Sequence, residues 1–166
     1  MEKFNHIELN NEVTKRGENG FFKLEKDQEA IAEFLREVDH RTVKFSSEMK
    51  RLRYLVEENF YYNIFDKYIE DEIVECLELA KNFKFEFKSY MAASKFYKDY
   101  ALKTNDKKQY LENFNQHVFI VAMYLGDGNT ALAKELMIAM LEQRLQPATP
   151  TFLNSGRSRR GELVSC

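Results

Sequence analysis

Between residues 25 and 145, apolar residues recur at intervals of three and four positions, which is the spacing of a helix that buries one face. The pattern predicts a helix from Glu25 onward, another that begins at Ser46 or Ser47, and then helices over residues 69–83, 89–102, 109–125 and 130–145. A serine suits a helix start because its hydroxyl accepts a hydrogen bond from a first-turn amide. Residues 130–145 are apolar on almost every side, so we expect that helix to be buried all round.

The first 24 residues follow a different pattern. Ile7, Leu9 and Val13 stand among polar residues, and Gly17 and Gly20 follow them. This arrangement is typical of a short strand or hairpin with a glycine turn. We therefore expect a small mixed α/β start on a mainly α-helical chain.

The helical period ends before Pro147, since the residue that precedes a proline is disfavoured in a helix. Beyond it we expect an irregular tail, whose backbone is stiffened by two prolines and whose short hydroxyl side chains are Thr149, Thr151, Ser155, Ser158 and Ser165. Backbone amides beside such residues can cradle phosphate or ribose oxygens. Arg157, Arg159 and Arg160 form a basic cluster that could attract an anionic substrate, but loop arginines also serve solubility or subunit contact.

Composition narrows the class of protein. The chain has 166 residues, enough for a real hydrophobic core, and its 6 glycines and 2 prolines favour long helices. A net charge of −2 argues against a nucleic-acid binder, which needs a basic face. No apolar run is long enough for a membrane span, and the only cysteines are Cys76 and Cys166, with no signal peptide before them. These features indicate a cytoplasmic protein.

Three candidate groups are expected to be structural. Cys76 lies on an apolar helical stripe, where a free cysteine behaves as a small hydrophobe. His117 adjoins the apolar face of its helix and is expected to be a hydrogen-bonded core residue. The acidic group between Glu70 and Glu78 lacks the Glu-x-x-His pairs of a di-iron bundle, so a solvated helix face is the better interpretation.

The tail sequence QPATPTFLNSGRSRRGELVSC resembles the segment that enters the catalytic barrel of the large subunit of class Ib ribonucleotide reductases. Shorter resemblances lie upstream, in YALKTNDKK at residues 100–108 and IELNNEV at residues 7–13, so the similarity covers the whole chain in register. The family's large subunit is several times longer. The resemblance implies a shortened ATP-cone-like region over residues 1–45, a helical domain over 46–146, and the first segment of an incomplete α/β barrel over 147–166.

The resemblance also implies the chemistry. The family reduces ribonucleoside diphosphates to deoxyribonucleotides, and it binds the substrate through positions that match Thr149 or Thr151, Ser165 and Cys166. Cys166 would be catalytic as one thiol of a redox pair, which becomes a disulfide and is reset by an external thiol system. Which of the two threonines points inward stays open.

The implied partners lie outside this sequence. They are the remainder of the large subunit, a metal-containing small subunit that generates the radical, a glutaredoxin-like thiol donor and nucleotide effectors. The chain itself is expected to hold no metal or cofactor. Its N-terminal region would either bind a deoxyadenosine nucleotide or serve as a clip that anchors the start of the chain.

Two hypotheses of different classes follow. In the first, the chain is part of a reductase large subunit and is inactive without the remainder. Leu163 and Val164 would then begin a strand without neighbours, so we expect the last ten to fifteen residues to be disordered or bound by a partner. In the second, the chain is a stand-alone helical module that binds an adenine nucleotide or a reductase subunit without catalysis.

Overall fold

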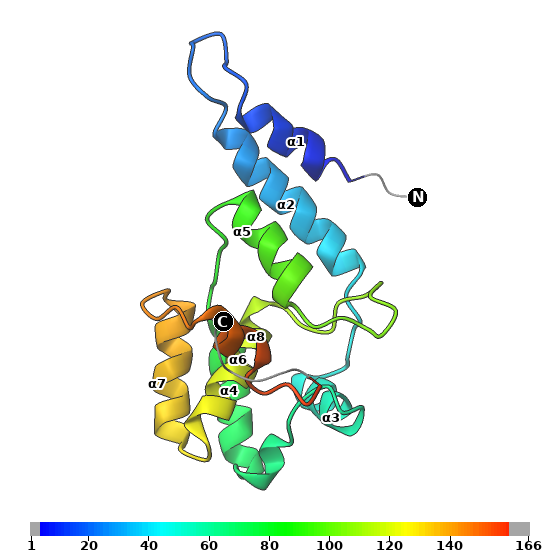
Figure 1. The fold of residues 1–166 in the computed structure, drawn as a ribbon, viewed down its shortest axis with the longest axis vertical. Helices are drawn as coiled ribbons and strands as arrows, with labels where there is room; N and C mark the ends of the chain where they lie inside the picture. Colours follow the sequence, from blue (N-terminus) through cyan, green and yellow to red (C-terminus); the bar gives the residue numbers. More distant parts are fainter. Residues whose placement is uncertain (1–3, 160–166) are drawn as a thin grey trace. The chain divides into compact units, whose positions relative to one another are not determined.

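A computed structural model of the chain describes residues 4–159, which are mainly helical (Figure 1). The elements are α1 (His6–Val13), α2 (Glu25–His40), α3 (Glu48–Glu57), η1 (Ile64–Asp66), α4 (Glu70–Asn82), α5 (Tyr90–Lys95), η2 (Phe96–Tyr100), α6 (Phe114–Gly126), α7 (Thr130–Leu141) and α8 (Thr149–Asn154). Within residues 4–159, strand-like pairing is limited to isolated bridges. The predicted mainly α-helical fold class is confirmed.

The helices divide into two compact units, and each unit is built from two separate stretches of chain. The first unit combines Met1–Val43 with Glu86–Glu112, and the second combines Lys44–Phe85 with Asn113–Cys166. The chain therefore leaves the first unit and returns to it before it completes the second. The three-part division suggested by the sequence stays a prediction.

In the first unit, α2 packs against both α1 and α5 (Figure 1). The buried face of α2 consists of Ala30, Ile31, Phe34 and Val38, which is the face that the helical spacing predicts. α1 is joined to this face through His6. Its Nε2 lies 2.8 Å from a Glu37 carboxylate oxygen, its Nδ1 lies 2.9 Å from the Tyr90 hydroxyl, and its ring packs edge-on against Phe34.

The prediction of a strand near residues 7–13 is wrong, because these residues form α1. His6, Leu9 and Val13 are partly covered at helical spacing, whereas Ile7 is 62% exposed. Docking onto α2 therefore outweighs the local strand preference. The glycine turn is confirmed: the Gly17 amide donates to the Phe21 carbonyl at 2.8 Å.

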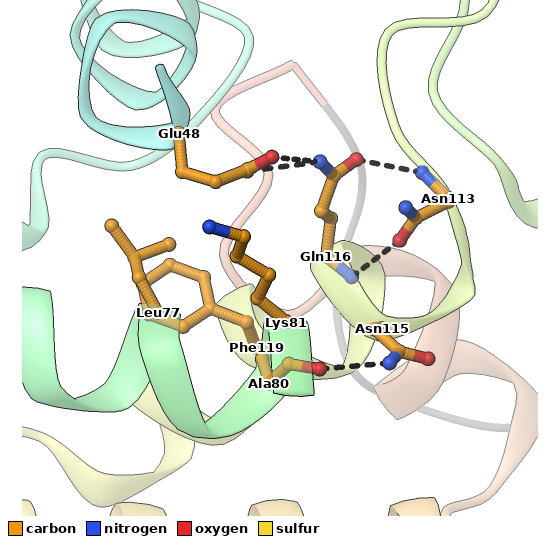
Figure 2. Close-up of a pocket in the computed structure, with 8 residues that line it drawn as sticks. All are labelled: Glu48, Leu77, Ala80, Lys81, Asn113, Asn115, Gln116 and Phe119. Atoms are coloured by element: carbon orange, nitrogen blue, oxygen red, sulfur yellow. Dashed lines mark hydrogen bonds between the residues drawn. The ribbon is translucent and has the colours of Figure 1, made fainter. Parts of the chain in front are cut away.

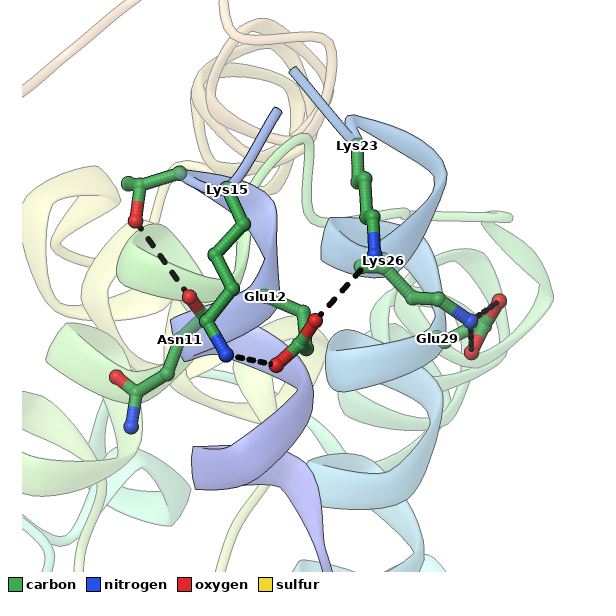
Figure 3. A network of polar contacts seen from close by, with 7 residues as sticks. Asn11, Glu12, Lys15, Lys23, Lys26 and Glu29 are labelled. Carbon is green, nitrogen blue, oxygen red and sulfur yellow. Dashed lines mark hydrogen bonds and ion pairs between the residues drawn. The ribbon is translucent and has the colours of Figure 1, made fainter. Parts of the chain in front are cut away.

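Polar contacts surround that turn (Figure 3). The Glu12 carboxylate of α1 pairs with Lys15 at 2.5 Å and with Lys23, ahead of α2, at 3.5 Å. Farther along, Lys26 pairs with Glu29 within α2. These groups are near the surface, so they contribute modestly and are weakened by salt.

In the second unit, α6 is the central helix and packs against α4, α7 and α8. Its residues from Val118 to Met123 are fully buried. Asn113 and Gln116 form a capping box at its start: the Gln116 amide donates to Asn113 Oδ1 at 3.0 Å, and the Asn113 amide donates to Gln116 Oε1 at 2.8 Å. Asn113 thus fixes the first residue of α6 at Phe114.

The predicted start of this helix at residue 109 is therefore wrong, because α6 begins at Phe114. Tyr110 and Leu111 carry the helical pattern, but their backbones pair with other parts of the first unit. The Val43 amide donates to the Tyr110 carbonyl at 2.9 Å, and the Leu111 amide donates to the Leu102 carbonyl at 2.9 Å. Extended pairing satisfies these groups and delays the helix.

The expectation that residues 130–145 are a helix buried all round is also wrong. α7 buries one face, made of Ala133, Met137, Met140 and Leu141, while Leu132 is 40% exposed. The helix stops at Leu141, because Gln143 takes a left-handed φ of 59° and the Arg144 and Leu145 amides turn back to the Ala139 carbonyl. Such a turn satisfies carbonyls at the end of a helix.

Other boundaries match the sequence. Ser47 caps α3 by accepting from the Lys50 amide at 3.2 Å, as predicted. Ser89 caps α5 in the same way, and the helical path continues as the wider turn η2 up to Tyr100. Cys76 lies in α4 and is fully buried, as its position on the apolar stripe predicts.

Candidate functional site

The tail after Pro147 is not irregular throughout, since Thr149–Asn154 form α8. Pro150 lies in the first turn of this helix, where the missing amide hydrogen has no intrahelical role and the fixed φ suits the helix. The expectation of an irregular tail rested on the loss of the helical period after Pro147. It is wrong for Pro150, because a proline in the first turn begins a helix as readily as it ends one.

The predicted substrate-binding threonines are both in α8. Thr149 is exposed and Thr151 is partly covered. Residues two positions apart project from different sides of a helix, so the two side chains cannot meet one ligand from the same face of α8. Ser165 and Cys166, together with Arg160, lie outside the described residues.

His117 of α6 is the main polar anchor of the tail. It is fully buried, its Nε2 lies 2.7 Å from the Phe152 carbonyl oxygen, and Arg157 Nη2 donates to its Nδ1 at 2.8 Å. The Phe152 ring also packs edge-on against the imidazole. His117 is thus a hydrogen-bonded core residue, as its place on the apolar face predicts, and both of its partners belong to the tail.

Backbone pairing fixes the next residues. The Tyr62 amide donates to the Gly156 carbonyl at 2.9 Å, and the Ser158 amide donates to the Phe60 carbonyl at 3.1 Å, so residues 156–158 pair antiparallel with residues 60–62. The Arg157 guanidinium stacks over the Tyr61 ring, 5.2 Å from its centroid. The expected disorder is therefore wrong for residues 152–159, which find a partner within their own unit, and the rest of that prediction falls outside the described residues.

The basic cluster serves the fold at the positions that the structure describes. Arg157 is 8% exposed and points toward His117 and Tyr61. Arg159 donates to the Glu58 carbonyl and lies over the Phe60 ring. Both arginines therefore hold the tail against the loop before η1, which favours the structural alternative over direct substrate contact.

The described part of the second unit contains a smaller and a larger cavity. The smaller, about 80 Å³, is lined by Glu48, Leu77, Ala80, Lys81, Asn113, Asn115, Gln116 and Phe119 (Figure 2). Gln116 Nε2 donates to both Glu48 oxygens at 2.9 Å, and Asn115 Nδ2 donates to the Ala80 carbonyl at 2.7 Å. Because these polar groups bind one another and the space suits only a few waters, the cavity serves mainly to join α3, α4 and α6.

The larger cavity has a volume of about 270 Å³ and is lined by Tyr62, Ile64, Lys67, Tyr68, Met123, Tyr124 and Asp127. The Tyr62 and Tyr124 rings meet edge to face, with centroids 5.6 Å apart, and Lys67 pairs with Asp127 at 3.2 Å. The Tyr68 hydroxyl donates to the Met123 carbonyl at 2.8 Å. Sequence reasoning missed both cavities, because their walls come from segments far apart in the chain.

Several acidic residues of α4 have protein partners. Glu70 pairs with Arg53 at 2.8 Å, Glu72 accepts from the Thr130 hydroxyl at 2.7 Å, and Glu75 pairs with Lys134 at 2.5 Å. Among residues 4–159, no three His, Cys, Asp or Glu side chains are grouped closely enough to hold a metal ion. In the same part of the chain, no helix is both long and apolar enough to cross a membrane.

Burial gives Cys76 the properties of a structural thiol. Removal from water raises the pKa of its thiol, and the neighbouring Glu75 and Glu72 act in the same direction, against an opposing effect of Lys134. A raised pKa leaves little thiolate at neutral pH, and thiolate is the reactive form. Cys76 is therefore a poor candidate for redox chemistry.

Known proteins resemble the chain over nearly its whole length. A family model for the ribonucleotide reductase N-terminal region matches residues 6–85, and one for the ribonucleotide reductase all-alpha domain matches residues 86–160. The ribonucleoside-diphosphate reductase NrdEB subunit alpha of Bacillus subtilis is 45% identical over 164 residues, which are 98% of this chain and 15% of that protein.

Two further relatives agree. The ribonucleoside-diphosphate reductase subunit alpha of Bacillus subtilis is 46% identical over 96% of this chain and 23% of its own length. The corresponding subunit of Mycoplasma pneumoniae is 41% identical over 89% of this chain and 20% of its own length. The chain thus spans less than a quarter of each of these curated relatives. It belongs to the ribonucleotide reductase large-subunit family.

Proposed function

We propose that the chain forms the N-terminal part of a class Ib ribonucleoside-diphosphate reductase large subunit and that it acts in the cytoplasm together with the remainder of that subunit. The observation that carries the proposal is the identity of 45–46% to two Bacillus subtilis alpha subunits over 96–98% of this chain. The anchored tail supports it, since contacts within the second unit give residues 152–159 a fixed base ahead of Ser165 and Cys166.

In this function, Cys166 is one of two thiols that reduce the substrate. The pair gives two electrons and two protons to the ribonucleoside diphosphate, the 2′ hydroxyl leaves as water, and the two sulfurs join as a disulfide. A glutaredoxin-like thiol donor then reduces the disulfide by exchange. The second thiol belongs to the remainder of the large subunit, and a small subunit supplies the radical that starts the reaction.

The tail also contributes to substrate binding in this proposal. Ser165 and one of the two α8 threonines bind the nucleoside diphosphate. Thr149 is the better candidate of the two on exposure, because Thr151 is partly covered. The N-terminal region up to residue 45 serves as the shortened cone, residues 46–146 as the helical domain and residues 147–166 as the first barrel segment.

A chimera tests the proposal. The matching 162 residues of the Bacillus subtilis subunit alpha are replaced by this chain, and reduction of a ribonucleoside diphosphate is measured with the small subunit and a dithiol. We expect turnover in the chimera and its loss in Cys166→Ser. Cys76→Ala is the matched control, because it removes the other thiol and should leave turnover largely intact. Turnover that survives Cys166→Ser would contradict the proposal.

A further inference from the structure

The buried imidazole of His117 contacts the tail at two points that are five positions apart in the sequence. Nε2 lies 2.7 Å from the Phe152 carbonyl oxygen, and Nδ1 lies 2.8 Å from Arg157 Nη2. One side chain of α6 therefore spans the end of α8 and the start of the extended segment. Ile120, one turn farther along α6, packs against Gly156 between these two points.

The partners determine which tautomer His117 adopts. A guanidinium only donates hydrogen bonds, so Nδ1 must accept from Arg157 and carries no proton. A carbonyl oxygen only accepts, so Nε2 must carry the proton that is donated to Phe152. The neutral Nε2–H imidazole is the only form that satisfies both contacts, because the other tautomer or an imidazolium would place an N–H against the guanidinium.

Burial makes this arrangement costly to break. His117 is fully buried and Arg157 nearly so, and a buried polar group that loses its partner keeps the whole cost of its removal from water. Loss of His117 would affect the Phe152 carbonyl and the Arg157 guanidinium together. Other supports of the segment include the stacking of Arg157 on Tyr61, the contacts of Arg159 with Glu58 and Phe60, and the backbone bonds of Tyr62 and Ser158.

We infer that His117 is a positioning residue: without contacting substrate, its Nε2–H tautomer fixes the course of residues 152–159, from which the chain runs on to Ser165 and Cys166. The catalytic consequence rests on the proposed function. The structural consequence does not, so the two can be tested separately.

The first experiment identifies the tautomer in the unaltered chain. Nuclear magnetic resonance of the protein with ¹⁵N-labelled histidine distinguishes the two ring nitrogens, and His117→Gln assigns the signals. At neutral pH we expect a neutral ring with the proton on Nε2. A proton on Nδ1, or on both nitrogens, would overturn the inference, and this result needs no destabilised variant.

The second experiment compares two substitutions of similar size. His117→Gln retains one donor and one acceptor, whereas His117→Leu retains neither. In His117→Leu we expect amide exchange at Tyr62 and Ser158 to accelerate by about tenfold or more, while α4 is unchanged. In His117→Gln the rates should stay within about threefold of the original. Equal protection in all three proteins, or equal loss in both variants, would refute the inference.

The same pair of variants in the chimera tests the catalytic consequence. We expect His117→Leu to lower kcat by about tenfold with little change in KM, and His117→Gln to restore most of it, because thiol placement and not substrate affinity is affected. A chimera that has no turnover before any substitution would count against the proposed function, while the exchange rates would still decide the role of His117. Turnover that is equal in both variants and the unaltered chimera would contradict the positioning role.

Discussion

Gly156 lies against Ile120 so closely that a Cβ on Gly156 would be 2.5 Å from Ile120 Cγ1 and 2.9 Å from the Ile120 carbonyl oxygen. Gly156 also has a φ of +73°, which side chains rarely adopt. The backbone of the tail can therefore rest on α6 only because this residue is glycine. This contact adds to the hydrogen bonds of His117 and to the backbone pairing with residues 60–62 in holding the tail in the second unit.

Gly156→Ala should lower the free energy of unfolding of the second unit by about 2–4 kcal/mol, because the strained φ and the clash with Ile120 add together. Gly20→Ala is the matched control: Gly20 has a φ of +79° but no atom within 4 Å of the added methyl group. It should cost the first unit only about 1 kcal/mol. Denaturant unfolding followed by amide exchange measures both, and equal costs would refute the close contact.

Tyr68→Phe should destabilise the second unit by about 1 kcal/mol, because the buried hydroxyl donates to the Met123 carbonyl at 2.8 Å. Tyr124→Phe is the control, since Tyr124 is half-exposed at the rim of the same cavity. Its effect should stay within about 0.5 kcal/mol. Urea denaturation of the two variants provides the comparison, and an equal effect would show that the Tyr68 bond contributes nothing.

The first unit should lose stability at high pH through Tyr97. Burial, with smaller effects of Glu112, Tyr110 and Asp39, raises the pKa of Tyr97 well above its value in the unfolded chain. The folded state then keeps a proton that the unfolded state loses. The contribution is complete below about pH 10 and declines as the pH rises toward the folded pKa.

Tyr97→Phe should therefore reduce the slope of stability against pH above pH 10 by up to about 1.4 kcal/mol per pH unit. Some slope should remain, because burial also raises the pKa of Tyr90 and Tyr110 in the same unit. Denaturant titrations between pH 9 and about pH 12 measure it. An unchanged slope would mean that Tyr97 ionises in the folded state as easily as in the unfolded one.

His6→Ala should free α1 from α2, because His6 makes the side-chain hydrogen bonds that join α1 to Glu37 and Tyr90. Amide protection within α1 should fall while protection within α2 persists. Asn11→Ala is a suitable control, since it replaces an exposed side chain of the same helix. If amide protection within α1 is equal in the two variants, the His6 contacts do not hold α1 against α2.

Local signals explain what the sequence could predict. Ser47 and Ser89 indicate where helices begin, because their hydroxyls accept hydrogen bonds from first-turn amides. Cys76 lies among apolar residues at helical spacing, and this spacing predicts that its side chain is buried. The position of His117 beside an apolar face predicts its burial in the same way. These features depend on neighbours within one or two helical turns.

Long-range contacts explain what it could not predict. α1 is helical because His6 meets residues from α2 and α5, and the tail is ordered through residue 159 because it meets His117 and the loop at 60–62. Glu48 and Gln116 are 68 positions apart, yet they share hydrogen bonds in one cavity. Periodicity locates elements along the chain, but it does not say which of them will become partners.

The central claim is that Cys166 is half of the dithiol that reduces the substrate. It is tested most directly by a single turnover of the chimera without external reductant, followed by alkylation of free thiols and peptide mass spectrometry. We expect about one disulfide containing Cys166 for each deoxyribonucleotide formed, with Cys76 still a free thiol. If deoxyribonucleotide forms but Cys166 is afterwards fully alkylated, its thiol stayed free during the turnover, and the claim is contradicted.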